Sequence, residues 1–393
     1  MKSTIKHNGN YRVPTVLGVF VISCIAFSAC NRFVAPLPDA QNANGNWLVA
    51  GANPARTSYL ELAPAMPLAE ISRFKLSAAP AQNLFIHNGI LFAPTLDGKL
   101  FTVDLEKKRI LSKKKMPGGH AGTLALQHDA MILAMRYGKE TLFHYNLTQR
   151  ERLWEIDAGD IASEPLLADS CVYVSAIYEH VDAYHLSDGS RRWQFRTTGQ
   201  LHASPALAEG TLIAVTDRGK IYALNANEGK LLWEADLGQP ILGTPAIAHG
   251  QVYVGTTGDL IVAFALQTGA ENWRCKTEGR IFHAPAVNDS LVIFGASDGF
   301  VRALHRRNGA LAWTFRATSG IGTAPLIAGD KVFFGSLDKN IYCVDSSAGA
   351  MLWQWNLEGR VRTNPLVWKD RLIVASEDRY LYMFGPQEQA GTN

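Results

Sequence analysis

One repeating pattern of Pro, Gly and Trp runs through most of this chain and constrains its fold more than any other feature. The three residue types recur in fixed phase, and each returns after the same step. The series are Pro165, Pro205, Pro245, Pro285, Pro325 and Pro365; Gly189, Gly229, Gly269, Gly309 and Gly349; and Trp193, Trp233, Trp273, Trp313 and Trp353. A step of about 40 residues indicates a repeat architecture, in which each copy is one supersecondary unit stacked on the next.

Each repeat has the pattern of four short strands. In one copy, apolar runs at 245–249, 251–255 and 260–266 are followed by a more polar run at 271–276. β-branched and aromatic residues favour strands, and Gly-containing turns separate the runs. Because the inner three strands are apolar on both faces, copies of the sheet must cover one another. This requirement predicts a β-propeller.

The Trp of each repeat stands near the start of the fourth strand, where we expect it to wedge between neighbouring blades. Burying roughly 200 Å² of indole contributes up to about 5 kcal/mol per Trp. We expect the turn Gly before it to supply a positive φ, which Gly adopts without steric cost.

The two ends of the repeat region each hold part of a blade. Residues 365–384 supply three strands, and Trp47 opens a lone strand at residues 46–50. We expect this N-terminal strand to pair beside residues 380–384 and close the ring, which removes open sheet edges. The predicted fold class is therefore all-β: an eight-bladed β-propeller of four-stranded antiparallel blades over residues 47–386, with its ring closed by an N-terminal strand. A disordered tail is predicted at residues 387–393.

Residues 1–29 have the pattern of a lipoprotein signal peptide. Three basic residues precede an apolar run at 15–27 that is too short to span a membrane comfortably. Phe27-Ser28-Ala29-Cys30 resembles the bacterial lipobox, with Phe27 where Leu is usual. We expect lipidation at Cys30; the alternative is an ordinary signal peptide with an incidental Cys. Residues 30–46, rich in Pro, Asn and Ala, are predicted to form a flexible tether.

Charge argues against a nucleic-acid partner. The chain has a formal charge of +3, and its leader contributes Lys2, Lys6 and Arg12 and no acidic residue. Removing these three leaves 38 − 3 = 35 basic residues against 35 acidic ones. A nearly neutral mature chain lacks the charge excess that is typical of nucleic-acid binding.

The spacing Ala-x5-Gly-x3-Trp, as in Ala223, Gly229 and Trp233, resembles the propeller repeat of the pyrroloquinoline-quinone (PQQ) type. Two families share this repeat: the quinoprotein dehydrogenases, and the outer-membrane assembly lipoprotein BamB with its relatives. The signal, tether, length and blade count resemble the second family. This resemblance implies a non-catalytic, monomeric propeller, lipid-anchored in the outer membrane and facing the periplasm. It also implies an envelope protein partner, such as the β-barrel assembly machinery, and no cofactor.

The alternative hypothesis is a PQQ-dependent periplasmic dehydrogenase. Enzymes of that family carry adjacent cysteines beside the quinone, whereas Cys171, Cys275 and Cys343 lie in three different repeats. Residues 295–299 match the G-x-S-x-G motif but coincide with a mid-blade hairpin, where a strand-to-helix turn would be required. His202 and His283 lie two repeats apart, so they could share a metal only across a central channel. We therefore predict no catalytic and no metal-binding residues.

The links between the fourth strand of one repeat and the first strand of the next are the predicted binding site. In BamB-like propellers such links contact the assembly barrel, and the matching links here are 198–203, 238–243 and 278–283. The candidate partner-binding residues are Gln200, Leu201, His202, Ile241, Leu242, Arg280, Ile281, Phe282 and His283. Exposed Leu, Ile and Phe beside an Arg is typical of a binding hot spot. The alternative is that these apolar residues plug the mouth of the channel.

Overall fold

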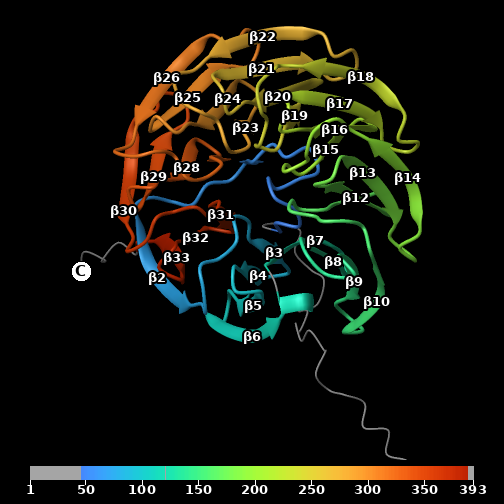
Figure 1. Cartoon of the computed structure of the whole chain (residues 1–393). Helices are drawn as coiled ribbons and strands as arrows, with labels where there is room; N and C mark the ends of the chain where they lie inside the picture. The colour runs from blue at the N-terminus through green and yellow to red at the C-terminus, as the bar shows by residue number, and fades with distance from the viewer. Residues whose placement is uncertain (1–45, 120, 388–393) are drawn as a thin grey trace, which may run out of the picture. The chain divides into compact units, whose positions relative to one another are not determined.

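Eight β-sheets are arranged in a ring in the computed structural model, which describes residues 46–119 and 121–387 (Figure 1). The predicted fold class, an eight-bladed propeller of four-stranded antiparallel blades, is confirmed. The predicted signal peptide, the lipidation site Cys30, the tether up to residue 45 and the tail from residue 388 lie outside the described residues. No helix in the described part of the chain has the length and apolar character needed to cross a membrane.

The first seven blades each follow the chain from the axis outward, as an antiparallel meander. The first blade contains β3 (Phe85–His87), β4 (Ile90–Thr95), β5 (Lys99–Asp104) and β6 (Arg109–Lys115), and the second contains β7 (Gly122–Gln127), β8 (Ala130–Met135), β9 (Leu142–Asn146) and β10 (Glu151–Ile156). The third contains β11 (Leu166–Ala168), β12 (Cys171–Ala176), β13 (His180–His185) and β14 (Arg191–Arg196), the fourth β15 (Ala206–Ala208), β16 (Thr211–Val215), β17 (Lys220–Asn225) and β18 (Leu231–Asp236), and the fifth β19 (Ala246–Ala248), β20 (Gln251–Gly255), β21 (Leu260–Ala265) and β22 (Glu271–Lys276). The sixth contains β23 (Ala286–Val287), β24 (Leu291–Gly295), β25 (Phe300–His305) and β26 (Leu311–Arg316), and the seventh β27 (Leu326–Ala328), β28 (Lys331–Gly335), β29 (Asn340–Asp345) and β30 (Met351–Asn356).

A β-bulge in the outermost strand aims the repeated Trp into the space between blades. In the fifth blade Ala263 pairs with Trp273 and Phe264 pairs with Glu271, so Asn272 is left out of the register. The bulge turns Trp273 inward, where it is buried, and leaves Asn272 exposed. The indole Nε1 then donates a 2.8 Å hydrogen bond to the carbonyl oxygen of Arg306 in the next blade. The prediction that the Trp wedges between blades is confirmed.

The turn Gly of the neighbouring blade makes room for that indole. Gly309 has φ +70°, and a Cβ added there would lie 2.6 Å from Cε3 of Trp273. The Gly is therefore required twice, once for its backbone conformation and once for close approach. The same contact recurs for Trp154 with Gly189, Trp193 with Gly229, Trp233 with Gly269, and Trp313 with Gly349.

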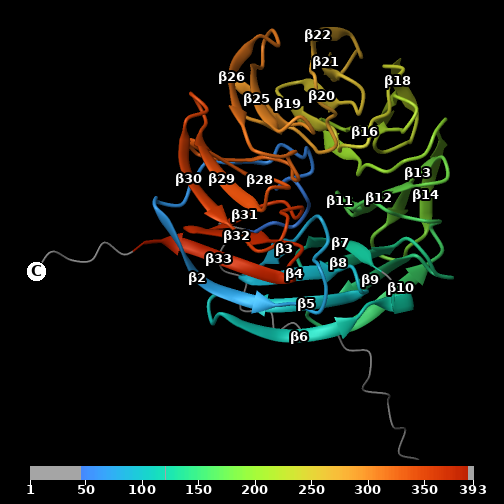
Figure 2. The ribbon, with the colours of Figure 1, turned by 60° about the vertical axis from the view of Figure 1, so that its left-hand side comes forward.

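The ring is closed by an N-terminal strand, but by a different one from the strand that we predicted. The last blade contains β31 (Leu366–Trp368), β32 (Arg371–Ala375), β33 (Tyr380–Pro386) and, at its outer edge, β2 (Leu68–Lys75). β2 pairs antiparallel with β33, and Figure 2 shows the two strands running side by side. The prediction that residues 46–50 pair beside 380–384 was wrong.

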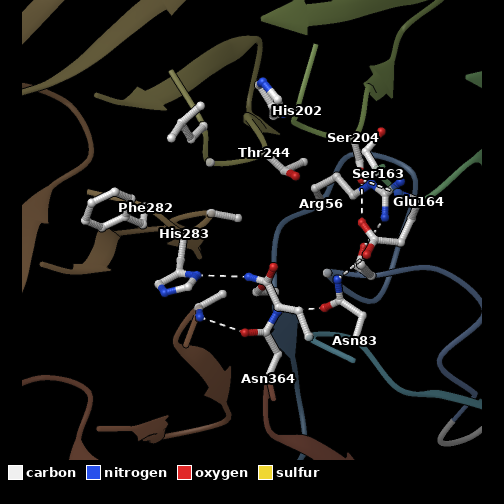
Figure 3. A pocket seen from close by; sticks show the side chains of 18 of the residues that line it. Arg56, Asn83, Ser163, Glu164, His202, Ser204, Thr244, Phe282, His283 and Asn364 are labelled. Carbon is white, nitrogen blue, oxygen red and sulfur yellow. Dashed lines mark hydrogen bonds between the residues drawn. The ribbon is translucent and has the colours of Figure 1, made fainter. Parts of the chain in front are cut away.

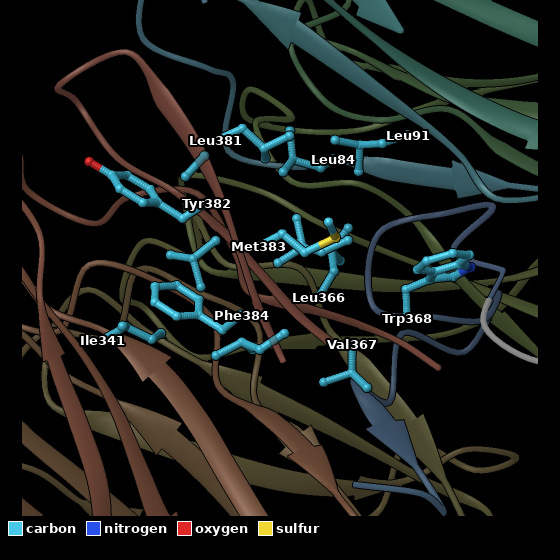
Figure 4. Close-up of a cluster of buried hydrophobic side chains, with 14 of the residues drawn as sticks. Leu84, Leu91, Ile341, Leu366, Val367, Trp368, Leu381, Tyr382, Met383 and Phe384 are labelled. Atoms are coloured by element: carbon cyan, nitrogen blue, oxygen red, sulfur yellow. The ribbon is translucent and has the colours of Figure 1, made fainter. Parts of the chain in front are cut away.

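Hydrophobic packing secures the closure on both sides of the last blade (Figure 4). One buried cluster joins Met383 and Phe384 of β33 to Leu84 and Leu91 of the first blade and to Ile341 of the seventh. The last blade is therefore held by side-chain packing against both neighbours as well as by the β2–β33 ladder.

Residues 47–60 run through the central channel, where the inner strands of six blades form backbone hydrogen bonds with them (Figure 1). Trp47 bridges Ile86 of β3, and its indole Nε1 donates a 2.7 Å bond to the carbonyl of Val367. Further backbone N–H donors reach this segment from the second, fourth, fifth, sixth and seventh blades: Leu126, Leu207, Ile247, Val287 and Ile327. The segment ends in β1 (Tyr59–Leu60), which adds a parallel fifth strand to the seventh sheet. The channel is thus filled by the chain's own backbone.

The predicted mid-blade hairpin is also confirmed. Residues 295–299 form the mid-blade hairpin between β24 and β25, so the G-x-S-x-G match is a turn between strands. Cys171, Cys275 and Cys343 are free thiols, and the first and last of them are buried.

Candidate functional site

The links between blades and the mid-blade hairpins lie on one face of the propeller, as their mutual hydrogen bonds show. The carbonyl oxygens of link residues Gln200, Pro240 and Arg280 each accept a hydrogen bond from a hairpin backbone N–H. The donors are Asp217, Thr257 and Ser297. We call this side of the propeller the link face.

Three of the predicted partner-binding residues are buried inside the propeller, so their assignment to a binding surface was wrong. Leu201, Ile241 and Ile281 are each 0% exposed. The Ile281 side chain packs directly on Gly255 of the preceding blade, and the backbone N–H of Ile281 donates to Thr256. These residues belong to another series with the period of the repeat, which fills the gap between blades: Ile161, Leu201, Ile241, Ile281, Ile321 and Val361. These three side chains are therefore part of the packing between blades, which is neither a binding surface nor the predicted plug at the mouth of the channel.

The other six predicted residues fall into two groups. Gln200 and Arg280 are exposed on the link face. His202, Leu242, Phe282 and His283 line a cavity at the inner ends of the links, although the sequence places them in three different repeats. The propeller brings them together because every link leads back to the axis before the next inner strand begins.

The cavity has a volume of about 80 Å³ and a polar lining. Residues 47–60, which we call the channel segment, contribute several lining residues, including Arg56. The other lining side chains shown in Figure 3 include Asn83, Ser163, Glu164, Ser204 and Asn364. The side chains outside the channel segment are held by the start of an inner strand or by the link before it. The site is therefore assembled from single residues of many blades.

Hydrogen bonds hold the polar lining in place. The Glu164 carboxylate accepts a 2.6 Å bond from Asn83 Nδ2 and a further bond from the Ser204 hydroxyl. Asn364 Nδ2 donates a 2.7 Å bond to Asn83 Oδ1. His283 Nδ1 lies 2.9 Å from Gln82 Nε2. These hydrogen bonds connect lining side chains from blades that are distant in the sequence.

The charges in the cavity balance. Burial lowers the pKa of the Arg56 guanidinium to about 10, and the nearby Glu164 carboxylate opposes that shift. Arg56 therefore keeps its positive charge at neutral pH. Burial, assisted by the charge of Arg362, lowers the pKa of His283 to about 4, so its imidazole is neutral there. Arg56 and Glu164 leave the lining with one positive and one negative group.

Sequence reasoning named part of this lining and missed Arg56. The links were predicted to carry the site, and they supply four of the nine predicted residues to the cavity. Arg56 carries no repeat signal, because the channel segment occurs once in the chain. The only sequence feature that sets Arg56 apart is its position between Trp47 and the repeats.

The residues present do not fit a quinone cofactor or a metal. A tricyclic quinone needs a pocket in the usual ligand range of about 300–1,000 Å³, whereas this cavity offers about 80 Å³ because residues 47–60 occupy the axis. His202 and His283 line the same cavity, but no group of three His, Cys, Asp or Glu residues comes together within residues 46–119 and 121–387.

The repeat, the blade count and the interblade Trp define a PQQ-like β-propeller. The family model described as outer membrane protein assembly factor BamB matches residues 178–314 and 297–387, more than half of the chain. The chain therefore belongs to this family. No curated protein matches the sequence.

Solved structures show the same fold at low identity. BamB from Moraxella catarrhalis aligns with a TM-score of 0.70 and 19% identity, over 81% of this chain and 100% of its own. The computationally designed Ika8 protein aligns at 0.71 and 15% identity, over 83% and 99%. Quinohemoprotein alcohol dehydrogenase from Comamonas testosteroni aligns at 0.74 and 13% identity, over 89% and 82%. At these identities the likeness defines the fold alone.

Proposed function

We propose that this protein is a non-catalytic, lipid-anchored scaffold that binds an envelope protein through its link face, as part of outer-membrane β-barrel assembly. The observation that carries the proposal is the pair Arg280 and Phe282 in one link, of which Phe282 lies at the edge of the cavity and is exposed there. The Phe282 ring is 39% exposed, and the exposed Arg280 guanidinium has no ion-pair partner among the described residues. An exposed aromatic ring beside an unpaired Arg is typical of a protein-binding hot spot.

Apolar exposure on the link face extends beyond this pair. The mid-blade hairpins of the first three blades carry Leu96, Tyr137 and Tyr178, which are 61%, 49% and 65% exposed. The corresponding turns of the regular blades, such as 216–219 and 256–259, are mostly Thr, Asp and Gly. Large apolar side chains that replace turn residues on one face support a docking role for that face.

The filled channel supports a scaffold over the alternative dehydrogenase. Residues 47–60 occupy the place at the axis where a large cofactor would have to lie, and the remaining cavity is small. Membership in the BamB family supports the assembly machinery as the partner.

The partner surface is tested by the double variant Arg280→Ala with Phe282→Ala. We expect the variant to bind the periplasmic domains of the assembly barrel roughly 30-fold more weakly, since hot-spot truncations cost about 2 kcal/mol or more. Its melting temperature should stay within a few degrees, because both side chains are exposed. Binding is measured by calorimetric titration with the purified periplasmic domains.

A matched control places the same changes on the opposite face. Arg307→Ala with Leu311→Ala removes one exposed Arg and one exposed apolar side chain from the turn between β25 and β26 and from the start of β26. This control should bind normally. Equal affinity of the Arg280/Phe282 variant and this control would contradict the proposed surface.

The membrane anchor is proposed from the leader sequence. We expect Cys30→Ser to prevent lipidation and to move the protein from the outer-membrane fraction to the soluble periplasm or to an unprocessed form. Cell fractionation with mass spectrometry of the N-terminus measures both outcomes. Unchanged outer-membrane association of the variant would contradict a lipid anchor at Cys30.

A further inference from the structure

We call the cavity at the inner ends of the links the axial cavity. Two buried polar groups of its lining residues have no hydrogen-bond partner among the described residues. They are Nη2 of Arg56 and the hydroxyl of Ser163. The two residues are 1% and 3% exposed, and both line the cavity. A buried donor without an acceptor costs free energy, so such groups are expected to meet a partner in the functional state.

The Arg56 guanidinium is fixed in position by the protein's backbone. Its Nη1 donates a 2.8 Å bond to the carbonyl of Ala50, and its Nε donates a 3.3 Å bond to the carbonyl of Pro205. These two carbonyls belong to the channel segment and to the fourth blade. With two of its nitrogens bound, Arg56 has Nη2 left for an acceptor that no described residue supplies.

Glu164 presents the complementary charge in the same cavity. The bonds from Asn83 and Ser204 hold its carboxylate in place and occupy one site on each oxygen. Each carboxylate oxygen accepts more than one hydrogen bond, so acceptor capacity remains. Figure 3 shows Glu164 beside Arg56 and Ser163.

The size and charge of the cavity limit what can fill it. A cavity of about 80 Å³ lies well below the usual ligand range of about 300–1,000 Å³, so only a small molecule fits it. A simple anion would satisfy Arg56 but meet the Glu164 charge, and a simple cation would meet the Arg56 charge. A ligand with no net charge that carries an acceptor at one end and a donor at the other satisfies both groups.

We propose that the axial cavity binds a small zwitterionic α-amino acid of the size of glycine or alanine. The ligand's carboxylate accepts hydrogen bonds from Arg56 Nη2 and the Ser163 hydroxyl, and its ammonium group donates to the Glu164 carboxylate. The neutral imidazole of His283 adds no charge that would disturb this pairing. Phe282 lines this cavity and also belongs to the proposed link-face surface. Arg56, Ser163 and Glu164, which carry the present proposal, are not part of that surface, so the two proposals can fail separately.

The test is calorimetric titration of the full-length protein in detergent with glycine and with L-alanine, compared with acetate, methylammonium and L-phenylalanine. We expect glycine and L-alanine to bind and the other three to bind at least tenfold more weakly. The two half-ligands each leave one charge unmatched, and the phenyl ring exceeds the cavity.

Ser163→Ala assigns the binding to this cavity without disturbing the fold, because it removes a hydroxyl that has no partner among the described residues. We expect about a tenfold loss of glycine affinity, as for one hydrogen bond to a charged group. The matched control is Ser175→Ala in β12, which removes another buried and unpartnered hydroxyl outside the cavity. The control should bind glycine like the native protein.

Three results would overturn the proposal. The first is no binding of glycine or L-alanine at millimolar concentration, which would leave water as the occupant. The second is acetate or methylammonium binding as tightly as glycine, which would remove the requirement for both charges. The third is equal glycine affinity in the Ser163→Ala and Ser175→Ala variants, which would place the binding elsewhere.

Discussion

Replacing Trp273 with Ala should lower the free energy of unfolding by about 3–5 kcal/mol, as for other buried Trp truncations. The indole lies between two blades, is 7% exposed, and contacts Tyr253 with ring centroids 6.0 Å apart. Its loss leaves a cavity at the interface and removes the hydrogen bond to Arg306. Denaturant unfolding of the native protein and the variant measures the difference.

Trp273→Phe separates packing from hydrogen bonding. The Phe ring retains part of the apolar contact but cannot donate to the Arg306 carbonyl. We expect this variant to be intermediate in stability. A Trp273→Ala variant that unfolds at the same denaturant concentration as the native protein would show that the indole does not hold the two blades together.

Gly309→Ala should destabilise the propeller by roughly 2–5 kcal/mol, a large effect for a single added methyl group, because two penalties combine. A left-handed conformation costs a non-Gly residue about 1–2 kcal/mol, and overpacking adds roughly 1–3 kcal/mol. Gly309 faces both, because its φ is +70° and the Trp273 indole occupies the place of a Cβ. Denaturant unfolding measures the total.

Gly250→Ala is the matched control for the backbone penalty alone. Gly250 has φ +69°, and nothing lies within 4 Å of the place that its Cβ would take. The difference between the two Gly variants therefore measures the close approach of the indole. In the double variant Trp273→Ala with Gly309→Ala, the overpacking cost should disappear, so the two changes should be less than additive. Strict additivity would contradict the contact.

The regular blades could be predicted from the sequence because one residue pattern determines both their strands and their packing. The run at 251–255 matches β20, and the runs at 260–266 and 271–276 match β21 and β22 within one residue. The recurrence of this pattern in fixed phase also indicated the blade count. Local propensity, turn chemistry and burial all agree in these repeats, which is why the prediction succeeded.

The closing strand could not be recognised by the same pattern. Ser72 pairs with Met383 at the register position where the second to seventh blades place a Trp, so β2 lacks the Trp signal. Trp47 carries that signal but lies in the channel, where Val367 accepts its indole hydrogen bond. A single Trp in the sequence indicates only that an indole is buried. The part of the fold in which it is buried depends on the residues that it packs against in the tertiary structure.

The sequence indicated which links carry the candidate site, but it did not indicate which side chains of those links are exposed. The apolar residues of the links alternate between the interblade gap, as at Ile281, and the rim, as at Phe282. One position of register separates a buried side chain from an exposed one, and composition does not reveal that register. The cavity depends on Arg56 and Glu164, which lie in different parts of the sequence and meet only when the ring forms.

The path of residues 46–75 makes this repeat protein behave as a single cooperative unit. In an open solenoid each repeat touches only its neighbours, and stability is close to a sum of local terms. Here backbone hydrogen bonds join the N-terminal segment to six blades, and the chain then supplies the outer strand of the eighth blade, which pairs with the last strand of the chain. Such long-range contacts slow folding, because the loop-closure entropy must be overcome before they form. No blade can be lost without breaking the ring, so we expect the whole domain to unfold in one transition rather than blade by blade.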